Sequence, residues 1–229
     1  MTTREVARRT SGHPVVTIDG PAGAGKSTVA RRLAERLGFT YVNSGAIYRA
    51  VAWRVSRGAT AEAALRTLRI EFTGAAGDQR MLIDGHEAPD ELYAPAVSEL
   101  AATLSQRPEI RAFADAIQRA QAARGPVVVE GRDAGTVVFP HAECKFYLDA
   151  SLEARARRRL AERRAAGERA DLGGIQTAIR ARDETDEQRP VAPLSKSEDA
   201  TYVDSSDMTV DDVVELMAKE VERTCSTRS

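Results

Sequence analysis

A glycine-rich loop near the start of the chain is the segment whose residue types most clearly suggest chemistry. Residues 20–27 read GPAGAGKS and match the phosphate-binding pattern G-x-x-x-x-G-K-[ST] in full. Glycines let consecutive backbone N–H groups turn towards phosphate oxygens, and the positive end of a following helix adds to the attraction. Lys26 would reach the β- and γ-phosphates of ATP, and the Ser27 hydroxyl would ligate Mg²⁺. The predicted ATP-binding residues are Gly20, Pro21, Ala22, Gly23, Ala24, Gly25, Lys26, Ser27 and Thr28.

This loop does not choose a reaction, and two classes of protein compete. One is a phosphotransferase with a second substrate, and the other is a switch or motor that hydrolyses nucleotide. GTPase switches read guanine with an Asn-Lys-x-Asp sequence, but the only asparagine in the chain is Asn43. Motor ATPases need a water-polarising acid beside a hydrophobic strand, and Glu130 after residues 127–129 could serve as one.

Arginine dominates the cations of the chain, with 29 Arg against 4 Lys. Transfer of phosphate to a phosphate acceptor needs little base chemistry, because the acceptor is already ionised. It needs cations that hold two repelling anions in line. Guanidinium groups suit that task, since they stay charged and bind phosphate in a bidentate manner.

The elements that must position these residues alternate between strand and helix. Such alternation indicates right-handed crossovers and a parallel sheet, hence an α/β fold. Residues 69–90 break the pattern, because two alternating segments separated by a loop predict an antiparallel hairpin. Strands are predicted at 15–19, 40–42, 127–129, 145–148 and 202–203, and helices at 27–37, 44–57, 60–68, 95–105, 108–123, 151–166, 174–187 and 210–222. Ser44 is the predicted N-cap of the helix over 44–57.

Composition narrows the class of protein further. The chain of 229 residues is long enough for one full domain, and its net charge of −1 argues against a protein that coats nucleic acid. No run of residues approaches the ~18 apolar residues of a membrane span. Cys144 and Cys225 are too few and too far apart for a disulfide framework or a metal site, so we expect a cytoplasmic protein. Residues 1–13 are expected to form a disordered tail rather than a secretory signal.

Four segments together resemble the bacterial cytidylate kinases over residues 14–222. They are residues 18–21 leading into the glycine-rich loop, SGAIYR at 44–49, EGRDAGTVVFP at 130–140, and residues 182–194. The resemblance implies a P-loop kinase fold, with a five-stranded parallel sheet flanked by helices and a small antiparallel insert. It implies one domain over 14–224, with a core (14–43, 127–150 and 200–224), an acceptor-binding region with the insert (44–126) and a lid with its flanking helices (151–199).

The resemblance also implies an activity, the transfer of a phosphoryl group from ATP to CMP or dCMP with Mg²⁺. Asp133, Arg111 and Ser44 would read cytosine, with Asp133 accepting from the N4 amine; uracil would present a carbonyl there instead. Arg49, Arg132 and Arg189 would hold the acceptor phosphate, and Arg182 and Asp186 the ribose. The implied catalytic residues are Lys26, Arg132, Arg189 and Arg158. Residues 155–169 carry many arginines that acids one turn away could balance, but Arg155, Arg158 or Arg159 could also reach the transferred phosphate from a lid.

Plainer interpretations exist for several of these residues. Arg132 and Asp133 could pair with each other, and Arg111 could pair with Glu109 or Asp115 on a helix surface. Arg49 could lie on a solvated helix face. Two departures from the family pattern leave the preference between CMP and dCMP open. Asn43 stands where the family usually has an aspartate, and Ala102 stands near the position where related enzymes have a serine that contacts the ribose. Thr103 or Ser105 could take the place of that serine.

Two alternative functions remain. One is a P-loop kinase for another acceptor, such as UMP or a metabolite alcohol, for which Asp19 or Asp133 could act as general base. The other is a nucleotide-hydrolysing switch. In the favoured interpretation the partners are the small molecules ATP and CMP or dCMP, without nucleic acid or membrane, and the protein is a monomer.

Overall fold

A computed structural model describes residues 12–74, 78–165 and 167–226 of the chain. Most of the tail expected at 1–13 therefore lies outside the described residues. No helix in the described ranges is long and apolar enough to cross a membrane. The other elements named above lie almost wholly inside these ranges.

The centre of the molecule is a five-stranded parallel sheet, as the sequence predicts. Its strands are β1 (Val15–Asp19), β2 (Thr40–Asn43), β6 (Val127–Gly131), β7 (Cys144–Asp149) and β8 (Thr201–Asp204). They are ordered β2-β6-β1-β7-β8, with every neighbouring pair parallel. All five residues of β1 and of β6 are buried, which fits their β-branched, apolar sequences. Because the strands are parallel, the segments that follow them meet at one edge.

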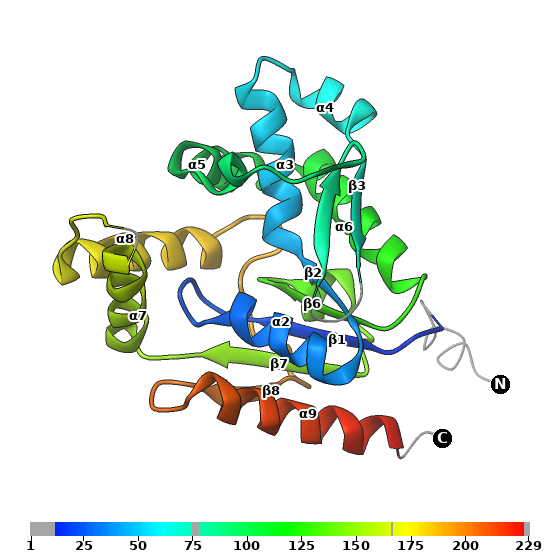
Figure 1. The fold of residues 1–229 in the computed structure, drawn as a ribbon, viewed down its shortest axis with the longest axis vertical. Coiled ribbons are helices and arrows are strands. Elements are labelled where there is room, and N and C mark those ends of the chain that lie inside the picture. The colour runs from blue at the N-terminus through cyan, green and yellow to red at the C-terminus, as the bar shows by residue number, and fades with distance from the viewer. Residues whose placement is uncertain (1–11, 75–77, 166, 227–229) are drawn as a thin grey trace.

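Helices cover the sheet and complete its core. The helices α2 (Lys26–Leu37) and α9 (Val210–Ser226) pack over the same face, where Leu33 and Met217 meet Phe146 of β7 (Figure 1). Two further helices, α7 (Leu152–Ala165) and α8 (Leu172–Glu187), form an arm beyond the glycine-rich loop, with a small core of their own (Figure 1).

A separate helical layer stands above the strand β2 (Figure 1). It contains α3 (Ser44–Ser56), α4 (Ala61–Thr67), α5 (Pro95–Leu104) and α6 (Pro108–Ala122), with the short 3-10 helix η1 (Asp90–Tyr93). Its core is built around the fully buried side chains of Leu68, Leu92 and Ile110.

The insert contains three strands, whereas the sequence predicted a two-stranded hairpin. The strands β3 (Ile70–Thr73), β4 (Arg80–Ile83) and β5 (His86–Glu87) form one antiparallel sheet. The third strand has only two residues, too short for an alternating pattern, and it follows a turn at Asp84 and Gly85, both of which have positive φ. The side chain of Gln79 docks the insert onto β2, because its amide donates to Phe39 O (2.7 Å) and accepts from Tyr41 N (2.5 Å).

Candidate active site

The glycine-rich loop links the end of β1 to the start of α2, as its pattern requires. Gly20 has φ +149°, and a Cβ there would lie 2.0 Å from the Leu148 carbonyl oxygen of β7, so only glycine fits. Gly25 caps α2 with φ 90° and without a side-chain hydrogen bond, which leaves the first backbone N–H groups of the helix for a ligand. Lys26 Nζ donates to Pro21 O at 2.6 Å. Burial and the neighbouring Arg132 lower the pKa of Lys26 well below its ordinary value.

Asp133 and Arg111 form a buried ion pair between the loop after β6 and helix α6. Arg111 also donates to Ser105 O (3.2 Å), and its guanidinium lies 5.7 Å from the centre of the Tyr48 ring. Arg111 therefore forms its ion pair with the buried Asp133 rather than with Glu109 or Asp115 on a helix surface. A carboxylate fixed in this way can accept a hydrogen bond from a substrate amine without reorganising.

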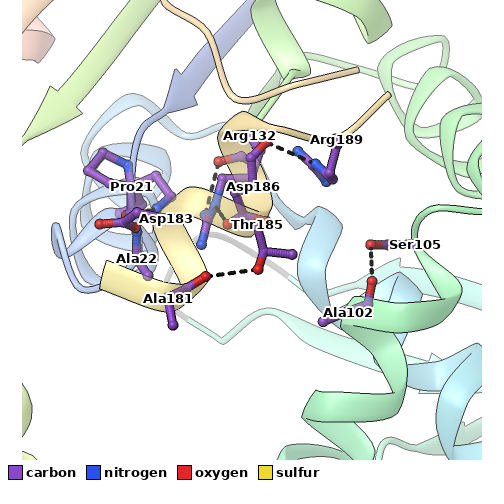
Figure 2. Close-up of polar contacts among 12 residues, drawn as sticks. Pro21, Ala22, Ala102, Ser105, Arg132, Ala181, Asp183, Thr185, Asp186 and Arg189 are labelled. Carbon is purple, nitrogen blue, oxygen red and sulfur yellow. Dashed lines mark hydrogen bonds and ion pairs between the residues drawn. The ribbon is translucent and has the colours of Figure 1, made fainter. Parts of the chain in front are cut away.

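Arg132 does not pair with Asp133, its neighbour in sequence. Its Nε donates to Asp186 Oδ2 of α8 at 2.7 Å (Figure 2). Burial acts to raise the pKa of Asp186, but Arg132, Arg189 and Arg182 outweigh it and hold the pKa below its ordinary value. Arg189 Nε donates to the main-chain oxygen of Asp186 (3.2 Å), and within the described residues the buried Arg189 Nη2 has no hydrogen-bond partner. This corner therefore concentrates positive charge.

Arg49 lies folded against its own helix rather than on a solvated face. Its Nε donates to Ser98 of α5 (3.3 Å), and its guanidinium sits 5.4 Å from the centre of the Tyr93 ring. A Cβ on Gly45 would lie 2.9 Å from Arg49 Nη1, so the glycine makes room for this conformation. Burial lowers the pKa of Arg49, although the group remains a guanidinium.

Ser44 is not the N-cap of α3, which corrects the sequence-based prediction. The cap is Asn43, whose side chain accepts from Ala46 N at 3.0 Å. Ser44 instead donates its hydroxyl to Glu130 O of β6 at 2.7 Å. The asparagine that departs from the family pattern thus holds the helix that carries Ser44 and Arg49.

The two candidates for the serine near Ala102 differ in position. Thr103 is exposed, and its hydroxyl donates to Glu99 O at 3.3 Å. Ser105 is buried and donates to Ala102 O at 2.8 Å, across from Arg189 in Figure 2. Because the Ser105 carbonyl also accepts from Arg111, Ser105 borders the Asp133 pair and Thr103 does not.

Arg158 and Arg159 of the arm differ in position, because Arg158 lies against the donor loop and Arg159 lies in solvent. Arg158 of α7 donates to Ser205 Oγ (3.1 Å) and to Ala24 O (3.3 Å). Arg159 is exposed and pairs with Glu162 one turn away (2.9 Å). Arg182 of α8 is partly open to solvent, but it lies one turn before Asp186, on the face towards Arg132. Burial and the neighbouring Arg132 lower its pKa to about 10.

Sequence reasoning missed an ion pair that joins both helices of the arm to the donor loop. Arg155 of α7 pairs with Asp183 of α8 at 2.5 Å and also donates to Ala22 O at 2.9 Å. Asp183 accepts from Ala22 N at 3.0 Å, so both polar groups of one loop residue are held by the arm. The sequence had offered Arg155 as one of three arginines, with Arg158 and Arg159, that could reach the transferred phosphate. The available signal was that Asp183 stands in the segment 182–194 that carries the family resemblance.

Comparison with known proteins shows similarity along nearly the whole chain. A family model described as cytidylate kinase matches residues 16–223. A cytidylate kinase from Symbiobacterium thermophilum is 43% identical, over 92% of this chain and 96% of the relative. One from Pelotomaculum thermopropionicum is 42% identical, over 91% and 96% of the two chains. A crystal structure of an uncharacterized protein from Eubacterium ventriosum has a TM-score of 0.53 at 12% identity, covering 92% of this chain and 99% of that one, which is a likeness of fold alone.

Proposed function

The chain belongs to the cytidylate kinase family, and we infer that it is a phosphotransferase that moves the γ-phosphoryl group of ATP to CMP or dCMP. At the level of residues, this inference rests on the buried ion pair of Asp133 and Arg111. The pair lies at the carboxyl ends of the strands, where the glycine-rich loop also lies. In open α/β sheets ligands bind at this edge. Donor and acceptor groups thus meet on one side of the molecule.

Asp133 distinguishes cytosine from uracil in this proposal. Arg111 holds its carboxylate in place, and the free lone pairs accept from the N4 amine of cytosine. Ser44 and Arg111 supply the remaining polar contacts to the base. Uracil would bring a carbonyl oxygen against the carboxylate, and sites that read a buried polar group in this way discriminate strongly.

The acceptor phosphate binds Arg49, Arg132 and Arg189. The buried Arg189 Nη2, which lacks a hydrogen-bond partner within the described residues, supports this assignment, because a guanidinium gains most from a bidentate anion. Asp186 orients Arg132 through its Nε and, with Arg182, would contact the ribose. Since the phosphate is already an anion, the site needs no general base, and charge neutralisation and alignment lower the barrier.

The donor ATP binds residues 20–28, with Lys26 turning from Pro21 O towards the phosphates and Arg158 beside the loop. Mg²⁺ suits this donor site, because it keeps several waters and takes most other ligands from substrate phosphates. The exposed hydroxyl of Ser27 on the first turn of α2 would supply one ligand. When bound, the ion neutralises charge on the β- and γ-phosphates.

Other parts of the assignment rest on the same family. We propose residues 44–126 as the acceptor-binding region and 151–199 as the lid, within one domain over 14–224. The protein is proposed to act as a monomer in the cytoplasm. Cys144, one of the two cysteines that prompted this expectation, is buried and outside any disulfide.

Replacement of Asp133 tests the proposed function at the residue that would read the base. We expect the wild-type protein to prefer CMP over UMP in kcat/KM by at least about a hundredfold. Asp133→Asn offers an amide donor to the uracil carbonyl, so the ratio should fall by at least about tenfold. Glu109→Gln, an exposed acid at the start of the same helix as Arg111, is the matched control and should leave the ratio unchanged. An unaltered ratio in Asp133→Asn would show that another group reads the base.

A further inference from the structure

Asp19 ends β1, directly before the donor loop, and is almost fully buried. Its Oδ1 accepts from Ala134 N at 2.9 Å, and its Oδ2 accepts from Gly135 N at 2.7 Å. These two N–H groups begin a short π-helical turn, η2 (Ala134–Val138), which carries no cap from its own preceding residue. The carboxylate of one strand therefore caps the turn that follows another.

Two glycines border the Asp19 carboxylate, one on each side. Asp19 is paired in register with Gly131 of the neighbouring strand, where a Cβ would lie 3.4 Å from Oδ1 and 2.9 Å from Ser44 Oγ. On the other side, a Cβ on Gly135 would lie 3.3 Å from Oδ2 and 2.7 Å from Thr17 Oγ1. A Cβ at either position would clash first with a neighbouring hydroxyl, and at Gly135 it would also crowd the Asp19 carboxylate, so glycine is needed for the loop to lie against this side chain.

The position of Asp19 in the chain links the two substrate sites. The donor loop begins at the next residue, Gly20. Asp133 directly precedes Ala134, whose N–H donates to Asp19. Arg132 is one residue further back. We propose that Asp19 is a positioning residue that fixes the loop bearing Arg132 and Asp133 relative to the donor loop, so that acceptor and donor phosphates are aligned. This inference rests on the proposed function.

Both oxygens of Asp19 are engaged by main-chain N–H groups, which argues against its use as a general base for a metabolite alcohol. A protonated carboxyl group would lose one of these acceptors and turn an O–H towards an N–H. Burial raises the pKa of Asp19 to about 6, against the lowering effect of the two N–H groups. The positioning is therefore expected to weaken as the pH falls through about 6.

The charged groups around Asp19 come from four parts of the fold. Asp133 of the acceptor loop raises its pKa, and Lys26 of α2 lowers it. Lys145 of β7 packs its aliphatic stem near Gly135 but directs Nζ to Asp199 (2.8 Å). Glu130 of β6, next to Gly131 in sequence, accepts from the Tyr41 hydroxyl (2.6 Å). Ionised Asp19 therefore has the two main-chain donors and Lys26 as its principal support.

The test compares the wild-type protein with Asp19→Asn, which keeps the shape but replaces one acceptor by an NH₂ donor. We expect the KM for CMP to rise by roughly tenfold and kcat to fall by a similar factor, while the KM for ATP changes less than about threefold. Thr17→Val is the matched control, because Thr17 is buried on the same strand and its Oγ1 has no hydrogen-bond partner among the described residues. It should leave both KM values within about twofold of the wild type.

The pH profile supplies a readout that a purely structural role would not move. Phosphate monoesters lose their second proton near pH 6, so the useful quantity is the ratio of wild-type to Asp19→Asn kcat/KM at each pH. This ratio should be constant above about pH 7 and fall by about tenfold between that plateau and pH 5, with its midpoint near 6. A ratio that stays constant with pH, or an unchanged KM for CMP in Asp19→Asn, would overturn the proposal.

Two further comparisons keep the result interpretable. If Asp19→Asn fails to fold, Gly135→Ala tests the position of the same loop. Its Cβ would lie 2.7 Å from Thr17 Oγ1 and 3.3 Å from Asp19 Oδ2, so the loop must move away from an intact carboxylate, and the KM for CMP should rise. An unchanged KM in that variant would also contradict the proposal. Wild-type activity with CMP tests the proposed function itself, so an active wild type with a normal Asp19→Asn variant rejects only the role of Asp19.

Discussion

Asp183 accepts a hydrogen bond from the Ala22 N–H at 3.0 Å and at the same time pairs with Arg155, which donates to the Ala22 carbonyl. One residue of the donor loop is thereby held at both its polar groups by two helices of the arm. Asp183 lies one turn of α8 before Asp186, which pairs with Arg132. The helix α8 therefore contacts both the donor loop and the acceptor side.

Breaking this contact should weaken the binding of ATP more than the binding of CMP. Asp183→Asn keeps an acceptor for Ala22 N but removes the ion pair, which leaves the Arg155 charge largely buried without its partner. We expect the KM for ATP to rise by about tenfold, or ~1.4 kcal/mol, with a smaller change for CMP. Steady-state kinetics with each substrate varied in turn measures this.

Glu184→Gln is the control for that experiment, since Glu184 is an exposed neighbour on the same helix. It should behave as the wild type. An Asp183→Asn variant whose KM for ATP is unchanged would mean that the contact with Ala22 has no part in donor binding.

Tyr93 should help to hold Arg49 ready for the acceptor phosphate. The ring is 57% exposed, so it is not needed for the core, and it faces the Arg49 guanidinium. A cation–π contact at an exposed site contributes about 0.5–1 kcal/mol, so Tyr93→Leu should raise the KM for CMP by about two- to fivefold. Tyr202→Leu removes a similarly exposed ring on β8 and is expected to leave that KM unchanged. Equal effects of the two substitutions would count against the role of Tyr93.

Asn43 should contribute to stability through its cap on α3. Asn43→Ala is expected to lower the free energy of unfolding by about 1 kcal/mol, because Ala46 N loses its acceptor. Asn43→Asp retains the cap and should be close to the wild type in stability. Denaturant titration of the three proteins measures the difference. An Asn43→Ala variant as stable as the wild type would show that the cap does not contribute to stability.

The local part of this architecture is predictable from sequence, because neighbouring residues determine it. The glycine-rich loop, the strand before it and the helix after it are confirmed, as is the parallel sheet, because their patterns are periodic and their spacing is short. The partners of the charged residues were not predictable. Arg132 pairs with Asp186, 54 residues away, rather than with the adjacent Asp133, and Arg111 reaches Asp133 across 22 residues.

Such pairings follow from how the strands place their ends, which a pattern of residue types does not encode. The N-cap of α3 was misassigned by one residue for a related reason, since Asn43 and Ser44 are both good caps and only the contact with Glu130 decides between them. The cap that Asp19 provides to a turn beyond a different strand was invisible for the same reason.

The most direct test of the central claim is the rate of ADP formation from Mg-ATP with CMP, dCMP, UMP, AMP or no acceptor. A cytosine-reading kinase predicts fast turnover with CMP or dCMP, and rates at least about a hundredfold lower with UMP or without acceptor. Equal ADP formation without any acceptor would contradict phosphoryl transfer and indicate a nucleotide-hydrolysing switch. Faster turnover with UMP or AMP would contradict the proposed role of Asp133 in reading the base.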